Sequence, residues 1–206
     1  MFKKHLSIML SIIMVITLLP LNALSESGGF IDMPNDWSKP ALEEAVKNGL
    51  LTGINEKIMP KENLTRAQMA TIINRAFGSE RTVSISKYTD VKTTDWFYQE
   101  MAKAVAMKTF QGSGDKLNPN NPITREEAFV VISRALNLES ISRTPTGFTD
   151  LVDISTWAKE SVYALINSGY IKGSNGKINP KGYITRAEFA QVMSNIIEKY
   201  INKSGE

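Results

Sequence analysis

Thr65-Arg66-Ala67-Gln68 has the form of a helix start, and the pattern returns as Thr124-Arg125-Glu126-Glu127 and as Thr185-Arg186-Ala187-Glu188. In each copy a threonine stands at the N-cap position, with a Gln or Glu three residues later. This is the capping box, in which each of the two side chains satisfies the free backbone N–H of the other residue. The three stretches therefore predict three helices that begin at equivalent points.

Four further positions keep step with this helix start. A tryptophan lies 29 residues before each motif arginine, and a glycine, a lysine and a proline follow the tryptophan at 16, 20 and 23 residues. The positions are Trp37, Gly53, Lys57 and Pro60; Trp96, Gly112, Lys116 and Pro119; and Trp157, Gly173, Lys177 and Pro180. A fixed period of this kind is the signature of a repeat architecture.

Each repeat predicts a helix, a loop and a second helix. The first helices are expected at about 39–48, 99–107 and 158–168. In the second helix of copy one, Met69, Ile72, Ile73 and Ala76 follow the spacing of one apolar face. Because one such unit cannot bury that face alone, we expect a mainly α-helical fold in which three units form one cooperative assembly.

Copy two differs where the first helix ends. Gly49 and Gly169 are placed to stop their helices in the left-handed conformation, whereas copy two has Lys108 there. A residue with a side chain costs about 1 kcal/mol in that conformation. The first helix of copy two is therefore expected either to carry this strain or to end differently.

The first 25 residues have the pattern of a secretion signal. Lys3 and Lys4 precede a largely apolar run from Leu6 to Leu19, which is shorter than the approximately 20 residues of a membrane span. The predicted organisation is 1–25 signal peptide, 26–78 first module, 79–87 linker, 88–138 second module, 139–147 linker, 148–200 third module and 201–206 tail. The chain is therefore expected to be exported, with no membrane contact after signal removal.

Composition excludes several classes of site. The chain has no cysteine, and its single histidine, His5, lies in the predicted signal. This argues against Ser-His-Asp and Cys-His catalysis, thiolate or imidazole zinc sites and disulfides. Without Lys3 and Lys4 the basic residues fall from 24 to 22 against 21 acidic ones, a near balance that gives no support for nucleic-acid binding. No cofactor and no metal are expected.

Three units of this composition resemble the S-layer homology domain of bacterial cell-surface proteins. The resemblance covers Phe30 to about Ile197 and includes the motif Leu/Ile-Thr-Arg-Ala-Glu with Trp, Gly and Pro in register. It implies a pseudo-threefold, three-pronged helical body whose grooves bind a secondary cell-wall polysaccharide, often one bearing pyruvate ketals. By resemblance, the protein would be a non-covalent cell-wall anchor and not an enzyme.

The motif arginines are the first candidates for polysaccharide contact. A pyruvate ketal presents a carboxylate, and a guanidinium can make paired hydrogen bonds to a carboxylate. Each arginine stands at the first position of a helix, where free backbone N–H groups and the helix dipole also favour an anion. The candidates are Arg66, Arg125 and Arg186.

Three other recurring residue types are candidates with open alternatives. The lysines Lys57, Lys116 and Lys177 add charge to a pocket or are simply exposed in a loop. The tryptophans Trp37, Trp96 and Trp157 stack on a sugar ring or, as we favour, anchor the core. The aspartates Asp32, Asp90 and Asp150, which open each unit after an aromatic residue, bind sugar hydroxyls or organise a turn through their own backbone.

Two substitutions distinguish the copies. Gln68 stands in copy one where the family has Glu, and it can still close the capping box. Glu126 stands in copy two where the family has Ala, and it is expected to neutralise Arg125 or to face solvent. Replacing the motif arginines by alanine is therefore expected to leave folding nearly intact and to weaken wall binding unequally, with Arg125→Ala mildest.

Other functions receive less support from the sequence. No copy is singled out as an active site would be, so an enzyme is disfavoured. The segment 112–118 resembles a calcium loop but lacks the alternating acidic ligands and the closing glutamate. An exported helical scaffold that binds another envelope or S-layer protein remains the alternative to polysaccharide binding.

Overall fold

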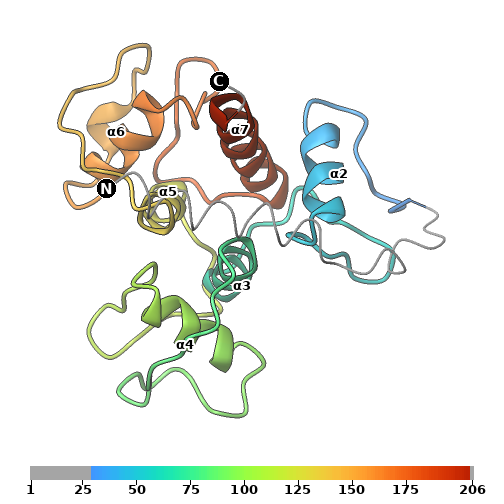
Figure 1. Cartoon of the computed structure of the whole chain (residues 1–206), viewed down its shortest axis with the longest axis vertical. Helices are drawn as coiled ribbons and strands as arrows, with labels where there is room; N and C mark the ends of the chain where they lie inside the picture. The colour runs from blue at the N-terminus through green and yellow to red at the C-terminus, as the bar shows by residue number, and fades with distance from the viewer. Residues whose placement is uncertain (1–28, 205–206) are drawn as a thin grey trace.

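The computed structural model describes residues 29–204, which form three helical lobes around a common centre (Figure 1). The predicted signal peptide, residues 1–25, lies outside the described residues. Six α-helices account for the regular structure of the described part, which contains isolated β-bridges but no strand. The mainly α-helical class predicted from the repeats is confirmed.

The helices occur in pairs, one pair for each repeat. The first helix of each repeat lies within two residues of its predicted bounds. The bounds are α2 Lys39–Lys47 and α3 Arg66–Ala76; α4 Tyr98–Ala106 and α5 Arg125–Ala135; and α6 Lys159–Asn167 and α7 Arg186–Ser204. A short 3₁₀ helix, η2, spans Leu151–Asp153 before α6. Helix α7 continues into the segment predicted as a tail.

The second helix of each repeat starts at a capping box. The backbone N–H of Gln68 donates to the Thr65 hydroxyl at 3.3 Å, and the backbone N–H of Thr65 donates to the Gln68 side chain at 3.0 Å. Thr124 with Glu127 and Thr185 with Glu188 make the same reciprocal bonds. The local sequence therefore fixes where α3, α5 and α7 begin.

Each lobe combines helices from two repeats. Helix α3 packs on α4, α5 packs on α6, and α7 returns to pack on α2. Figure 1 shows α3, α5 and α7 near the centre, with α2, α4 and α6 toward the outside. The second helix of every repeat thus buries its apolar face against the first helix of the next, and the third repeat closes onto the first.

A ring of backbone hydrogen bonds joins the three repeats at the centre. The N–H of Leu64 donates to Ile184 at 3.0 Å, that of Ile184 to Ile123 at 3.1 Å, and that of Ile123 to Leu64 at 2.9 Å. All three side chains are fully buried. Because these residues directly precede the N-caps of α3, α5 and α7, the ring fixes the relative positions of the three helix starts.

The first helix of copy two ends as the other two do. Lys108 has φ 62°, close to the values of 67° for Gly49 and 68° for Gly169. The N–H of the next residue, Thr109, donates to the carbonyl of Ala104, as in the other copies. Of the two expectations for Lys108, the strained left-handed conformation is therefore the one observed.

The recurring glycine of the loop is required by a close approach. A Cβ on Gly112 would overlap the ring of Tyr88, and it would lie 2.7 Å from the carbonyl oxygen of Lys116. Gly53 and Gly173 lie in the same way against Phe30 and Phe148. The aromatic residue that opens each unit thus packs onto the loop glycine of that unit.

Candidate functional site

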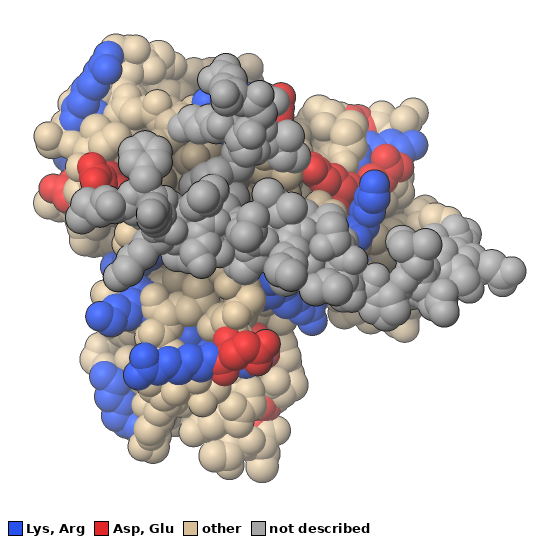
Figure 2. Space-filling model, in the orientation of Figure 1, with Lys and Arg blue, Asp and Glu red and all other residues tan. Residues whose placement is uncertain are grey.

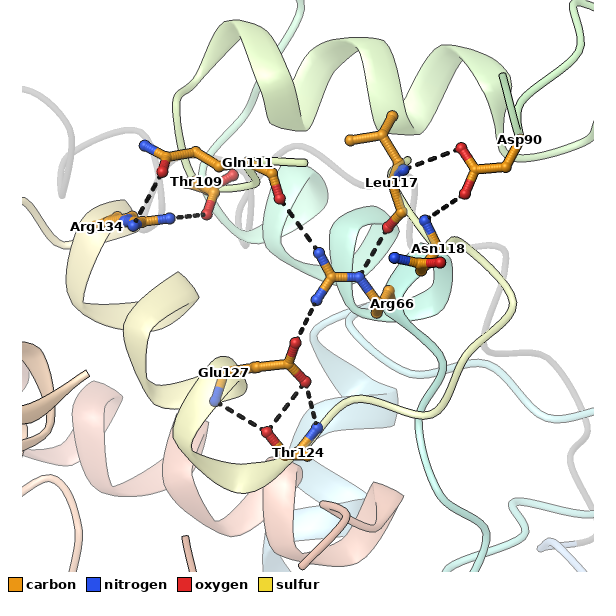
Figure 3. Close-up of polar contacts among 9 residues, drawn as sticks. All are labelled: Arg66, Asp90, Thr109, Gln111, Leu117, Asn118, Thr124, Glu127 and Arg134. Atoms are coloured by element: carbon orange, nitrogen blue, oxygen red, sulfur yellow. Dashed lines mark hydrogen bonds and ion pairs between the residues drawn. The ribbon is translucent and has the colours of Figure 1, made fainter. Parts of the chain in front are cut away.

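Each motif arginine reaches into the following repeat. Arg66 Nε donates to the carbonyl of Leu117 at 2.8 Å, as Figure 3 shows. Arg125 Nε donates to Ile178, and Arg186 Nε donates to Ile58, both at 2.7 Å. The three arginines therefore occupy equivalent inter-repeat positions, and the last again closes onto the first repeat.

The aspartates hold the same loops from the other side. Asp90 accepts the backbone N–H of Leu117 at 2.9 Å and that of Asn118 at 2.7 Å (Figure 3). The equivalent bonds run from Ile58 and Met59 to Asp32, and from Ile178 and Asn179 to Asp150. Each aspartate thus orders a loop 26 to 29 residues away rather than its own turn. Sugar contact by these carboxylates stays a prediction.

Two of the three arginines are paired with a carboxylate. Arg66 Nη1 lies 2.8 Å from Glu127, and Arg125 Nη1 lies 2.8 Å from Glu188. Burial lowers the pKa of Arg66, and the nearby carboxylates of Glu127 and Asp90 act in the opposite direction. In both pairs the carboxylate is the one that closes the capping box of the receiving helix.

Arg186 lacks this partner because copy one has Gln68 at the equivalent position. Its Nη2 donates instead to the carbonyl of Thr52 at 2.7 Å. Burial lowers the pKa of Arg186, and only Asp32 acts against that shift. The Arg186 side chain is therefore a buried cation without a direct ion pair among the described residues.

The N-terminal backbone N–H groups of these helices are already bonded. The N–H of Arg66 donates to Asn121 at 3.0 Å, and that of Ala67 donates to Pro119 at 2.9 Å. The same two positions of α5 and α7 donate to Gly182 and Pro180, and to Glu62 and Pro60. The expectation that free N–H groups would bind an anion here is wrong, since the loop of the next repeat occupies them.

The tryptophans are exposed, so the core position that we favoured for them is wrong. Trp37, Trp96 and Trp157 expose 60%, 64% and 58% of their surface. Each tryptophan stands just before a first helix, but the residue that follows it is the buried one. These buried residues are Ser38, Phe97 and Ala158. The indoles are therefore available to a ligand.

One groove, which we call the α5 groove, is built from all three repeats. It has a volume of about 600 Å³ and is lined by Arg66 of the first repeat, by the loop of residues 109–113 and α5 of the second, and by Trp157 and Tyr183 of the third. Glu127 and Arg134 stand on α5 within it. Arg134 donates to the carbonyl of Thr109 at 3.4 Å, and burial lowers its pKa (Figure 3).

A second groove, the α3 groove, repeats this construction one step around the body. It has a volume of about 240 Å³ and is lined by Arg186 of the third repeat, by residues 50–52 and α3 of the first, and by Trp96 of the second. Gln68 and Arg75 stand on α3 within it. In both grooves an arginine and a tryptophan from different repeats face a common space.

Sequence reasoning missed the second arginine of each groove. Arg75 and Arg134 both follow the motif arginine by nine residues, a register that the sequence displays. Asn195 holds this position in α7, where it is buried and donates to the carbonyl of Tyr170 at 3.0 Å. The equivalent site beside α7, which we call the α7 position, therefore has Arg125 and Glu188 but no second arginine.

The recurring lysines lie apart from the two grooves. Lys57, Lys116 and Lys177 are exposed, and each forms a bridge within a tight turn, with Ile54, Ser113 and Ser174 respectively. None of them lines the α3 or the α5 groove. A role for these lysines in polysaccharide binding stays a prediction.

Glu126 neither neutralises Arg125 nor faces solvent, so both expectations for it are wrong. It is buried, with 4% of its surface exposed. It accepts hydrogen bonds from the Ser155 N–H and hydroxyl, each at 2.9 Å, and from Lys181 at 2.7 Å. Because Ser155 and Lys181 precede Trp157 and Tyr183 by two residues, Glu126 ties together the two segments that carry the aromatic residues of the α5 groove.

Two other classes of site receive no support from the described residues. Between residues 29 and 204, no three carboxylates or other metal-binding side chains gather into a potential ion site. Over the same range, none of the helices has the length and apolar character to span a membrane. In the loop that resembles a calcium site, the Asp115 carboxylate accepts the Thr89 hydroxyl at 3.0 Å.

Comparison with known proteins places the repeats in one family. The model of the S-layer homology domain matches residues 29–70, 87–129 and 147–190, which together are more than half of the chain. Each match contains one motif arginine, one tryptophan and one loop aspartate.

The relatives are much longer proteins. A surface-layer 125 kDa protein of Lysinibacillus sphaericus is 34% identical over 168 residues, which are 79% of this chain and 14% of that protein. An exoglucanase, XynX, of Acetivibrio thermocellus is 29% identical over 191 residues, 89% of this chain and 17% of its own. The S-layer protein sap of Bacillus anthracis is 29% identical over 174 residues, 80% of this chain and 21% of its own. This chain thus spans less than a quarter of each relative, and with its three matched segments it belongs to the S-layer homology domain family.

Proposed function

We propose that this protein attaches non-covalently to the bacterial cell wall by binding a secondary cell-wall polysaccharide in its inter-repeat grooves. The observation that carries the proposal is the pairing of an arginine with an exposed tryptophan, from different repeats, in each of two grooves. Surface-layer relatives that share the domain support a location at the cell surface.

The chemistry of the grooves suits an acidic sugar. A guanidinium binds a carboxylate or phosphate through two parallel hydrogen bonds, and an indole face packs on the apolar face of a sugar ring. In Figure 2, lysine and arginine side chains gather over the lobe of α3 and α4. A pyruvate ketal supplies both a carboxylate and a ring, so we propose a pyruvylated sugar as the ligand unit.

The residues of the proposed site have different roles. Arg66, Arg186, Trp157 and Trp96 contact the ligand directly. The repeat register assigns Arg125 and Trp37 to the equivalent positions beside α7, where Asn195 stands in place of a second arginine. The aspartates Asp32, Asp90 and Asp150 keep the loops in place, since both oxygens of each accept backbone N–H groups. Lys57, Lys116 and Lys177 add positive charge outside the grooves.

The test is co-sedimentation of residues 26–206 with purified wall sacculi from a Gram-positive bacterium that makes a pyruvylated polysaccharide. The protein is expected to sediment with intact sacculi and to stay in solution after the polysaccharide has been removed with acid. Failure to bind intact sacculi would reject the proposal. The alternative, an exported scaffold that binds another envelope protein, would then be the hypothesis to test.

A further inference from the structure

The two grooves differ by one carboxylate. In the α5 groove, Arg66 donates to Glu127 at 2.8 Å, so this acceptor already occupies its Nη1. In the α3 groove the equivalent residue is Gln68, which is neutral. The acidic partner that offsets the motif arginine is thus present in one groove and absent from the other.

Arg186 is held in place without being neutralised. Its Nε and Nη2 donate to two carbonyl oxygens, of Ile58 and Thr52, at 2.7 Å each. Its Nη1 has no hydrogen-bond partner among residues 29–204, and 7% of the residue is exposed. Asp32 is the one nearby carboxylate that acts on Arg186, and it is not in direct contact with the guanidinium. A buried cation without a paired carboxylate is unfavourable, and an anionic ligand would supply that partner.

The second arginine strengthens the contrast. The Arg75 side chain is exposed in the α3 groove and makes no hydrogen bond or ion pair within the described residues. The Arg134 side chain is also exposed, but it donates to Thr109 and Gln111 in the α5 groove. The lining of the α3 groove contains two arginines and no acidic residue, and that of the α5 groove contains two arginines and one glutamate.

We infer that the two grooves take different parts of the polymer: the α3 groove selects the anionic substituent, and the α5 groove binds sugar rings largely irrespective of charge. The α5 groove offers two exposed aromatic side chains, Trp157 and Tyr183, in addition to the buried Phe110, where the α3 groove offers Trp96 alone. This inference rests on the proposed function and adds the class of ligand for each groove.

Each groove has its own spectroscopic reporter. The chain contains three tryptophans, of which Trp96 lines the α3 groove and Trp157 lines the α5 groove. Heteronuclear NMR of the labelled protein, residues 26–206, follows their indole N–H signals separately. The probes are a hexose methyl glycoside carrying a pyruvate ketal, its methyl ester and the corresponding hexose phosphate.

The free acid is expected to shift the Trp96 signal at a concentration about tenfold lower than the ester does, because only the acid can pair with a guanidinium. The Trp157 signal is expected to respond to acid and ester within about threefold, because Glu127 already pairs with Arg66 and repels a second carboxylate. Whether the ketal or the phosphate acts on Trp96 at the lower concentration identifies the source of the anion.

A reciprocal exchange tests the cause. Gln68→Glu installs the missing carboxylate and should weaken acid binding at Trp96 about tenfold without changing ester binding. Glu127→Gln should strengthen acid binding at Trp157 by a similar factor. Both variants keep a residue that can close the capping box, as the wild-type copies demonstrate.

Equal preference for acid over ester at Trp96 and Trp157 would overturn the inference, and so would an unchanged ratio at Trp96 in Gln68→Glu. If neither glycoside shifts either signal while sacculi still bind the protein, the charge assignment is wrong and wall attachment stands. If sacculi do not bind the protein, the proposed function itself is rejected.

Discussion

Arg186 Nε donates a hydrogen bond to the carbonyl oxygen of Ile58, 128 residues earlier in the chain, at 2.7 Å. The same contact joins Arg66 to Leu117 and Arg125 to Ile178 between successive repeats. The contact between the third repeat and the first is therefore of the same kind as the other two. The assembly is closed, although the chain is linear.

Closure predicts that two repeats do not suffice for a stable fold. A chain limited to residues 26–138 lacks α6 and α7, so α5 and α2 both lose the helix on which they pack. We expect residues 26–206 to unfold in one cooperative thermal transition, followed by circular dichroism, and the shorter chain to show no cooperative transition. A sharp transition of the two-repeat chain at a similar temperature would contradict this prediction.

The left-handed residue after the first helix gives a reciprocal stability test. Lys108→Gly should raise the free energy of unfolding by about 1 kcal/mol, because it removes the steric cost of a side chain at φ 62°. Gly49→Ala should lower it by about the same amount, since φ is 67° there. Urea denaturation measures both changes, and two shifts of the same sign would refute the argument from backbone strain.

Removing the Glu126 side chain should affect stability and one groove together. Glu126→Ala leaves the Ser155 N–H without its acceptor and is expected to lower the free energy of unfolding by about 2 kcal/mol. It should also weaken glycoside binding at Trp157 and leave binding at Trp96 unchanged, because only the former is attached to the Ser155 segment.

Lys181→Ala is the matched control for Glu126. The lysine side chain is 54% exposed, so removal of its ion pair should cost less than about 1 kcal/mol. Denaturant titration and the two indole signals provide the readout for both variants. Lys181 also donates to the Ser155 hydroxyl, so the control leaves only the bonds from Ser155 to Glu126 in place. A loss of stability with Lys181→Ala as large as that with Glu126→Ala would contradict the importance given to the Ser155 N–H bond.

Arg75 and Arg186 separate ligand binding from folding. The expectation that alanine at a motif arginine leaves folding nearly intact does not fit the bonds that Arg186 makes to two carbonyl oxygens. Arg186→Ala should lower the free energy of unfolding by about 1–3 kcal/mol as well as weaken wall binding. Arg75→Ala should weaken wall binding with little change in stability, since the side chain is exposed. Parallel sedimentation and urea assays would expose an error if Arg75→Ala left wall binding unchanged.

Local features of the fold were predictable from sequence, because the information for them is local. The capping boxes that begin at Thr65, Thr124 and Thr185 are each only four residues long, and each defines a helix start. Gly49 and Gly169 mark two helix ends. The apolar spacing of the second helices identified their buried faces. None of these features depends on which helix packs on which.

The long-range features were not predictable in the same way. The apolar face of α3 could be buried equally well against α2 of its own repeat or α4 of the next. The local sequence therefore does not indicate that each second helix packs on the first helix of the following repeat. The N–H groups of Arg66 and Ala67 meet carbonyls more than 50 residues away, and their occupancy could not be inferred from the helix start. Glu126 was misread for the same reason, since its partners belong to the third repeat.

The sequence predicts the kinds of residue in the candidate site, but only some of their positions in the structure. Arg66 and Arg186 line the two grooves, as expected of ligand-binding residues. No local pattern indicates that Glu127 pairs with Arg66, or Glu188 with Arg125, across a repeat boundary. An aromatic residue at a helix start usually packs in the core, but here the residue next to each tryptophan is the buried one. Arg75 and Arg134 were recognisable from their register alone.

The division of each groove among three repeats bears on how duplicated sequences diverge. The first repeat gives its arginine to the α5 groove and its second helix to the α3 groove, and the repeat register assigns its tryptophan to the α7 position. A substitution such as Gln68 therefore alters one groove and leaves the others as they were. Gene duplication followed by independent drift of the copies can in this way turn three identical sites into a set of specialised ones without disturbing their shared scaffold.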